Sequence, residues 1–256
     1  MINEIIHSFD LWTTAQAIKT SGRGRSAANQ SLHGINKLRE LIISLAIQGK
    51  LVPQKPDDEA AFVVLKKIIS KKEQLLKKGI IKSQSPLPKI REDEKPFELP
   101  GSWAWVRLGE VTNYGLIEKV EPGEVPENTW ILELEDIEKE TSKLLQKIRV
   151  CDKPFQSSKN RFYKGDVIYG KLRPYLDKVI VADEDGICTT EMIPLKGYDS
   201  ITPDFLRIVM KSSYFIHYAS ESTHGMNLPR LGTEKARLAL FPIVNSTLVN
   251  RVHNID

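Results

Sequence analysis

The chain has 256 residues, of which 41% are hydrophobic and 27% charged, a balance that is ordinary for a folded protein and excludes a largely disordered one. The longest apolar run, Leu41–Ile47, is interrupted by Ser44 and is too short to span a bilayer, and the N-terminus carries no export signal. Cys151 and Cys188 form neither a CxxC pair nor a metal-binding spacing, which indicates a reduced, intracellular protein. Together these features lead us to expect a cytoplasmic protein without membrane contact.

Two helices are predicted after an N-terminal leader, residues 1–34. In Ile35–Gly49 apolar residues recur at alternating steps of three and four, and a second helix with a similar seam ends near Gly79. We therefore predict a helical hairpin over residues 35–80 that forms a coiled coil or docks a partner. The seam residues are Ile35, Leu38, Ile42, Leu45, Phe62, Leu65 and Ile69.

A linker is predicted next, because residues 81–100 contain four prolines and dense mixed charge. Residues 101–244 then show short apolar runs between turn-forming residues, a pattern typical of β-strands, with two short helices expected at 203–211 and 214–221. The predicted fold class is α+β, a helical hairpin followed by a β-rich domain, with a tail over residues 245–256. Three adjacent strands are expected at Val167–Leu172, Lys178–Ala182 and Thr190–Leu195.

The net charge of +4 is unevenly distributed. Residues 143–178 contain ten lysines and arginines against three aspartates, and residues 118–140 just before them are strongly acidic. This asymmetry is typical of a nucleic-acid-binding face beside a repelling flank, although solvated loops are the commoner origin of a charged run.

A cationic bend, Lys171–Tyr175, separates the first two of the three strands and is the centre of the predicted DNA contact. Lys171, Arg173 and Lys178 are expected to contact phosphates or bases, with Tyr175 stacking or packing beside them. Backbone contacts are expected from three residues just upstream, Lys159, Arg161 and Lys164. The alternatives are a plain β-meander with solvated charges and a Tyr175 that is buried in the core.

A turn-rich loop at residues 222–230 supplies two further candidates. Asn227 has the chemistry to read an adenine edge and Arg230 a guanine edge. Alternatively, Arg230 only fastens its loop.

No catalytic motif is complete. Gly165–Leu172 approaches a phosphate-binding loop, but Leu172 lacks the hydroxyl that such a loop places on Mg²⁺. The carboxylates of residues 133–138 together with a nearby lysine could be drawn as the metal site of a nuclease, although acidic clusters are usually just solvated; the residues are Glu133, Glu135, Asp136, Glu138 and Lys139. We therefore expect a binding protein without catalytic residues, metal or cofactor.

Five segments taken together resemble the specificity subunit of Type I restriction–modification enzymes. FDLWTTA and SGRGR near the N-terminus are also similar to a leader found in some members of that family. The similarity covers most of residues 9–243. The five segments are LRELIISLAIQGKLVPQ (38–54), PDDEAAFVVLKKI, ELPGSWAWVRLGEV (98–111), GDVIYGKLRPYLDKVIVADEDGICTTEMIPL (165–195) and GMNLPRLGTEKARLALFPI (225–243).

The resemblance implies target recognition domains that read double-stranded DNA, joined by helices that form an antiparallel coiled coil. Those helices dock the modification (methyltransferase) subunits, through which the restriction subunit joins. S-adenosylmethionine, ATP and Mg²⁺ would then belong to the partner subunits alone. A protein-interaction module with an incidental basic face is the alternative.

The chain departs from the family pattern in having one recognition domain and one helical region where members usually have two. We therefore expect a half-length subunit, two copies of which pair through Ile35–Gly49 and read a symmetric site. An inactive remnant or a cassette that supplies sequence by recombination is the competing interpretation.

Overall fold

The computed structural model describes residues 11–12, 17–18, 30–31, 33–51, 53–55 and 59–244. Most of the predicted leader and the whole tail, residues 245–256, lie outside the described residues. The two short strands β1 (Ala17–Ile18) and β2 (Gln30–Ser31) pair antiparallel ahead of the first helix.

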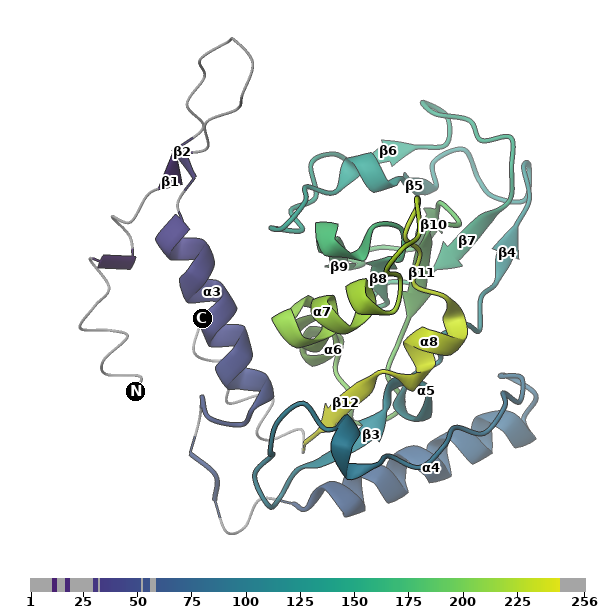
Figure 1. Cartoon of the computed structure of the whole chain (residues 1–256). Helices are drawn as coiled ribbons and strands as arrows, with labels where there is room; N and C mark the ends of the chain where they lie inside the picture. The colour runs from purple at the N-terminus through teal and green to yellow at the C-terminus, as the bar shows by residue number, and fades with distance from the viewer. Residues whose placement is uncertain are drawn as a thin grey trace.

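Both N-terminal helices form where the seams predicted them, as α3 (His33–Ile47) and α4 (Ala61–Lys77). The predicted hairpin is not confirmed, because each helix packs on the rest of the chain. α3 contacts α6 (Pro203–Lys211) and α7 (Ser213–Glu221), whereas α4 contacts α5 (Leu108–Val111) and β12 (Leu240–Ile243). Figure 1 shows α3 along one side of the globular part and α4 beneath it.

The burial of the two helices explains this arrangement. Leu45 and Ala46 of α3 pack with Ile208 of α6, and the buried face of α4 is formed by Val64 and Ile68 together with Ala61. A helix that is apolar on two sides must bury more than one face, and the β-rich domain offers an apolar surface to both helices.

The predicted linker, residues 81–100, is extended apart from the short helix η1 (Glu92–Glu94), but it lies against the domain. Trp105 Nε1 donates to the carbonyl of Phe97 (3.1 Å), and Gln84 Nε2 donates to that of Tyr114 (2.9 Å). An extended chain leaves its backbone groups and side chains free to bond with the domain, so hydrogen bonds in both directions hold it in place.

The β-rich domain contains two larger sheets. A five-stranded sheet has the order β4 (Lys119–Val120), β7 (Lys159–Phe162), β10 (Gly186–Cys188), β5 (Trp130–Leu132) and β6 (Ile148–Arg149), in which only β10 and β5 pair parallel. A three-stranded antiparallel sheet has the order β11 (Met192–Leu195), β8 (Val167–Gly170) and β9 (Val179–Val181). The three adjacent strands predicted from sequence are thus confirmed, with β8 in the centre.

The first and last strands of the β-rich domain lie side by side. β3 (Ala104–Arg107) and β12 pair antiparallel, and α8 (Thr233–Leu238) precedes β12. The predicted helices are confirmed as α6 and α7, which begin at the side-chain caps of Thr202 and Ser212. Their aromatic residues pack edge-to-face into the core, for example Phe215 on Tyr169 of β8 at 5.7 Å between ring centroids.

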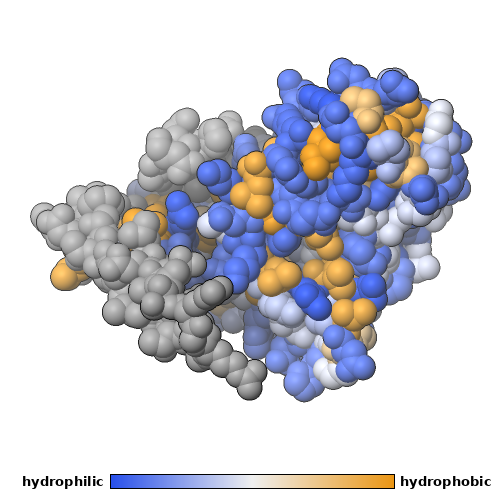
Figure 2. Space-filling model, turned by 90° about the horizontal axis from the view of Figure 1, so that it is seen from above, coloured by the Kyte–Doolittle hydropathy of each residue, from blue (hydrophilic) through white to orange (hydrophobic). Residues whose placement is uncertain are grey.

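The surface seen in Figure 2 is mostly hydrophilic, with small apolar patches dispersed over it. Within the described part of the chain, no helix combines the length and the apolar character needed to cross a membrane.

Candidate nucleic-acid interface

The bend between β8 and β9 is fixed by its own backbone. It contains the short helix η3 (Pro174–Leu176), in which the Leu176 N–H donates to the carbonyl of Arg173 (2.9 Å). Arg173 and Asp177 flank η3 with φ angles of 51° and 49°, a left-handed conformation that non-glycine residues rarely adopt. The turn leaves Tyr175 52% exposed, so the alternative that Tyr175 is a core residue is wrong.

The turn-rich loop at residues 222–230 lies directly beside this bend. The Arg173 N–H donates to the carbonyl of Pro229 (2.7 Å), the Leu231 N–H donates to that of Lys171 (3.0 Å), and Leu172 and Arg230 form an isolated β-bridge. Main-chain hydrogen bonds therefore join two segments that are far apart in sequence.

We call the result the bend–loop surface. It brings together the sequence-predicted residues of both segments and adds two exposed apolar side chains, Met226 and Leu228, that the sequence reasoning missed. The signal that could have found them is the presence of two large apolar residues among turn-forming ones. The bend–loop surface consists of Lys171, Arg173, Tyr175, Met226, Asn227, Leu228 and Arg230.

The cations of this surface differ in their partners. Arg230 Nε forms an ion pair with the Glu191 carboxylate (2.9 Å), which favours the interpretation that Arg230 fastens its loop. Within the described part of the chain, the side chains of Lys171 and Arg173 have no ion-pair or hydrogen-bond partner. These two charges are therefore available to an anionic ligand.

Four other predicted contacts lie outside the bend–loop surface. Lys159 pairs with Glu133 and Arg161 with Glu118 (2.7 Å), while Lys178 Nζ donates to the carbonyl of Leu134 (2.7 Å). Burial lowers the pKa of Lys178. The Lys164 side chain is exposed. Lys159, Arg161 and Lys178 already have partners within the protein, which does not favour a role in DNA binding. The DNA contacts of all four residues stay predictions.

The acidic residues Glu133, Glu135 and Asp136 are not arranged as a metal site. Glu133 pairs with Lys159, and Glu135 pairs with Lys153 (3.0 Å), whose hydrogen bond lowers the pKa of Glu135. Asp136 is buried and accepts hydrogen bonds from its neighbours on both carboxylate oxygens. Among the residues that the structure describes, no group of His, Cys, Asp or Glu is placed to hold a metal ion.

The predicted seam residues divide between the two faces of their helices. Leu45 is buried and Leu65 is partly buried, whereas Phe62 and Ile69 of α4 are 60% and 48% exposed. Ile42 of α3 is also partly exposed, and Ile35 and Leu38 are half-buried. Phe62 and Ile69 are two turns apart and define an outer apolar stripe of α4.

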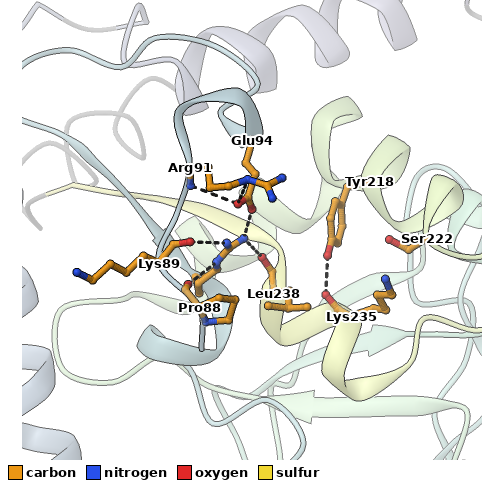
Figure 3. A pocket seen from close by; sticks show the side chains of 9 residues that line it. Pro88, Lys89, Arg91, Glu94, Tyr218, Ser222, Lys235 and Leu238 are labelled. Atoms are coloured by element: carbon orange, nitrogen blue, oxygen red, sulfur yellow. Dashed lines mark hydrogen bonds and ion pairs between the residues drawn. The ribbon is translucent and has the colours of Figure 1, made fainter. Parts of the chain in front are cut away.

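An open pocket of about 380 Å³ lies where residues 88–94 meet α7 and α8. Figure 3 shows Pro88, Lys89 and Glu94 on one side and Tyr218 and Lys235 on the other. Arg107 is 4% exposed and occupies this junction, where it pairs with Glu94 (2.7 Å) and donates to the carbonyl of Leu238 (2.9 Å). The guanidinium already has partners on both sides, so the pocket is a structural junction.

The sequence and the fold of the chain can be compared with those of known proteins. A scan against protein-family models gives no match. Over 105 residues the chain is 53% identical to the specificity subunit of the Type I restriction enzyme EcoAI of Escherichia coli, a match that covers 41% of this chain and 18% of that protein. The EcoEI specificity subunit of the same organism is 52% identical over 108 residues, covering 42% and 18%. Over about two fifths of its length, the chain is thus similar to the specificity subunits of Type I restriction enzymes.

More distant matches cover more of this chain. The EcoDI specificity subunit of Escherichia coli is 28% identical over 199 residues, which is 77% of this chain and 40% of that protein. The HsdS subunit of Thermoanaerobacter tengcongensis shares the fold with a TM-score of 0.53 and 23% identity over 63% of this chain and 43% of that one. A chain from a structure on the assembly and conformational transition of the type I R-M system gives a TM-score of 0.55 and 24% identity, covering 62% and 43%. The matched region is thus less than half of each relative.

Proposed function

We propose that this chain recognises DNA sequence within a Type I restriction–modification complex and does no chemistry of its own. The observation that carries the proposal is the bend–loop surface, where the unpaired charges of Lys171 and Arg173 and the exposed ring of Tyr175 belong to one short bend. Unpaired cations beside an exposed aromatic ring suit a phosphate backbone and the bases next to it.

The residues of the bend–loop surface take different roles in this proposal. Lys171 and Arg173 contact phosphates and set the register of the protein on the duplex. Asn227, which is exposed at the tip of the loop, reads a base edge, and Met226 and Leu228 supply apolar contacts such as those made to thymine methyl groups. Arg230 holds the loop through Glu191 and leaves specificity to its neighbours.

The chemistry of the complex is assigned to other chains. Modification subunits would bind S-adenosylmethionine and methylate adenine, and a restriction subunit would use ATP and Mg²⁺. The chain itself holds no cofactor in this proposal.

The outer apolar stripe of α4 is the proposed docking face for the modification subunits or for a second copy of the chain. Phe62 and Ile69 expose large apolar side chains, whose burial in an interface is favourable by roughly 1.5 to 3 kcal/mol each. Because α3 and α4 do not pair with one another, the outer face of α4 is available for a coiled coil formed with another chain.

Co-expression with the modification subunit encoded beside it, followed by mapping of methylated adenines, tests the proposal. We expect adenine methylation at a defined sequence that requires the chain and is lost in the Lys171→Ala/Arg173→Ala variant. Lys89→Ala is the matched control, because Lys89 is an exposed lysine of the linker segment. Methylation that does not depend on the chain, together with no binding of duplex DNA, would contradict the proposal.

A further inference from the structure

Backbone strain is concentrated beside the bend–loop surface. Among the described residues, five non-glycine residues have a positive φ: Glu140, Ser142, Arg173, Asp177 and Asp199. Four of the five belong to two segments, 140–142 and 173–177. Residues held in this left-handed region cluster at ligand-binding sites, where the surrounding structure must hold them in place.

The two strained segments are bonded to each other. The Glu140 N–H donates to the carbonyl of Leu176 (2.9 Å), and the Ser142 hydroxyl donates to the carbonyl of Asp177 (2.6 Å). The same hydroxyl oxygen accepts from the Val179 N–H (3.0 Å). Segment 140–142 therefore supports the end of the bend just after η3.

One ammonium group ties the strained residues together. Lys211 Nζ donates to the Glu140 carbonyl (3.1 Å), to Ser142 Oγ (2.7 Å) and to the Asp177 carboxylate. With this bond, the single donor and both lone pairs of the Ser142 hydroxyl are used. We call Lys211, Glu140, Ser142 and Asp177 the Lys211 clamp.

The ion pair of the clamp is largely buried, and burying its two charges is costly. The side chains of Lys211 and Asp177 are 9% and 12% exposed. Burial lowers the pKa of Lys211 and raises that of Asp177 to about 6, with Arg207 and Glu140 as the other charged neighbours of Asp177. Apolar residues often stabilise a fold as well as a buried ion pair does, so an ion pair at this position calls for a role besides stability.

We propose that Lys211 is a positioning residue for DNA recognition, which holds the strained bend in the conformation that presents Arg173 and Tyr175 to the duplex. The inference rests on the proposed function of the bend–loop surface. Lys211 lies at the C-terminal end of α6, one face of which is buried in the core, so the clamp fixes the bend to a rigid element.

The test compares duplex binding with hydrogen exchange in the full chain. Lys211→Met keeps an unbranched side chain and removes all three donated hydrogen bonds. Lys147→Met is the matched control, since Lys147 is also partly buried and ion-paired, with Asp183 (2.7 Å), but lies next to β6. The DNA probe is a labelled random-sequence duplex.

We expect Lys211→Met to weaken duplex binding about tenfold to a hundredfold, because only a fraction of the molecules then hold the bend in its binding conformation. The salt dependence of binding keeps its wild-type slope, since Lys211 contacts no phosphate. Amide exchange at Glu140, Leu176 and Val179 becomes faster. Lys147→Met leaves all three measurements unchanged.

A rescue separates positioning from general stability. In the double variant Lys211→Met/Asp177→Gly, the carboxylate that has lost its ion-pair partner is removed, and glycine adopts the left-handed backbone at position 177 without strain. We therefore expect the affinity for duplex DNA to recover in part. If Lys211→Met does not fold, Asp177→Asn is measured in the same way, because asparagine tolerates this backbone and removes only the charge.

Three outcomes would overturn the inference. If folded Lys211→Met binds duplex DNA and exchanges its amide hydrogens as the wild type does, the clamp plays no part in DNA recognition. If the variant has a reduced salt slope, Lys211 is a direct phosphate contact. Unchanged exchange at the bend would show that the clamp holds nothing. If the wild-type chain binds no duplex at all, the proposed function fails, and the exchange measurement alone decides whether the clamp exists.

Discussion

Replacing Arg107 by methionine should loosen the contact of residues 88–94 with the β-rich domain and destabilise the chain. The Arg107 guanidinium pairs with Glu94 (2.7 Å) and donates to three carbonyls: that of Leu238 at 2.9 Å and, at 3.3 Å each, those of Pro88 and Lys89. Methionine fills a similar volume without any donor. The perturbation therefore removes the polar connection between residues 88–94 and α8 while leaving the apolar packing nearly intact.

The magnitude follows from these contacts. A hydrogen bond to a charged group contributes about 1.5 to 3 kcal/mol, and the two bonds of 3.3 Å are at the weak end. Loss of one partner of a buried ion pair costs about 3 to 5 kcal/mol, but Glu94 keeps some contact with water and is solvated again in the variant. We expect the free energy of unfolding to fall by about 2 to 4 kcal/mol.

The assay is urea unfolding of the full chain, with Arg91→Met as the matched control. Arg91 also pairs with Glu94 (3.4 Å), but its side chain is 72% exposed, so its loss should change stability by less than about 1 kcal/mol. A double-mutant cycle with Glu94→Gln isolates the Arg107–Glu94 pair. If Arg107→Met lowers the free energy of unfolding no more than Arg91→Met does, the buried Arg107 contacts do not stabilise the chain as stated.

Three further predictions concern other parts of the fold. Ile69→Ser should abolish any self-association seen by light scattering with little loss of stability, whereas Ile68→Ser, one residue away on the buried face, should cost about 3 kcal/mol or more in thermal unfolding. Gly186→Ala should destabilise by about 1 to 3 kcal/mol, because a Cβ there would overlap the ring of Phe162; wild-type stability would contradict the packing of β7 on β10. Since burial raises the pKa of Asp177 to about 6, the wild type should gain stability relative to Asp177→Asn as the pH falls from about 7 to about 5, and a pH-independent difference would contradict that pKa.

Short-range patterns predicted the elements of the fold well. The turn residues Arg173-Pro174 and Asp183–Gly186 mark the ends of β8 and β9, and the three- and four-residue seams mark α3 and α4. β10 was missed because its three residues follow a turn directly and are too few for a periodic pattern. Local sequence specifies where a strand or helix forms, whereas its partner depends on contacts distant in sequence.

The helical hairpin was not confirmed for this reason. A seam such as Phe62, Leu65 and Ile69 predicts an apolar face that must be covered, and the β-rich domain covers part of the apolar surface of both helices. Ile68, which the seam did not include, is fully buried in the core.

The candidate site was partly predictable. The bend and the loop were identified separately, but their main-chain pairing through Leu172 and Arg230 is tertiary and leaves no local signal. Lys159 was selected by residue type and local charge density, and its pairing with Glu133 depends on the sheet order, in which β7 and β5 lie on either side of β10. The Lys211 clamp could not be predicted, since it joins Lys211 to residues that lie 34 to 71 positions away in the sequence.

The most direct test of the account is the salt dependence of duplex binding by the full chain and its Lys171→Ala/Arg173→Ala variant. We predict a steep dependence for the wild type and a slope lower by about two units in the double variant, roughly 0.9 for each phosphate contact removed. Equal slopes for the two proteins, or wild-type binding that does not change with salt, would contradict the claim that the bend–loop surface grips DNA.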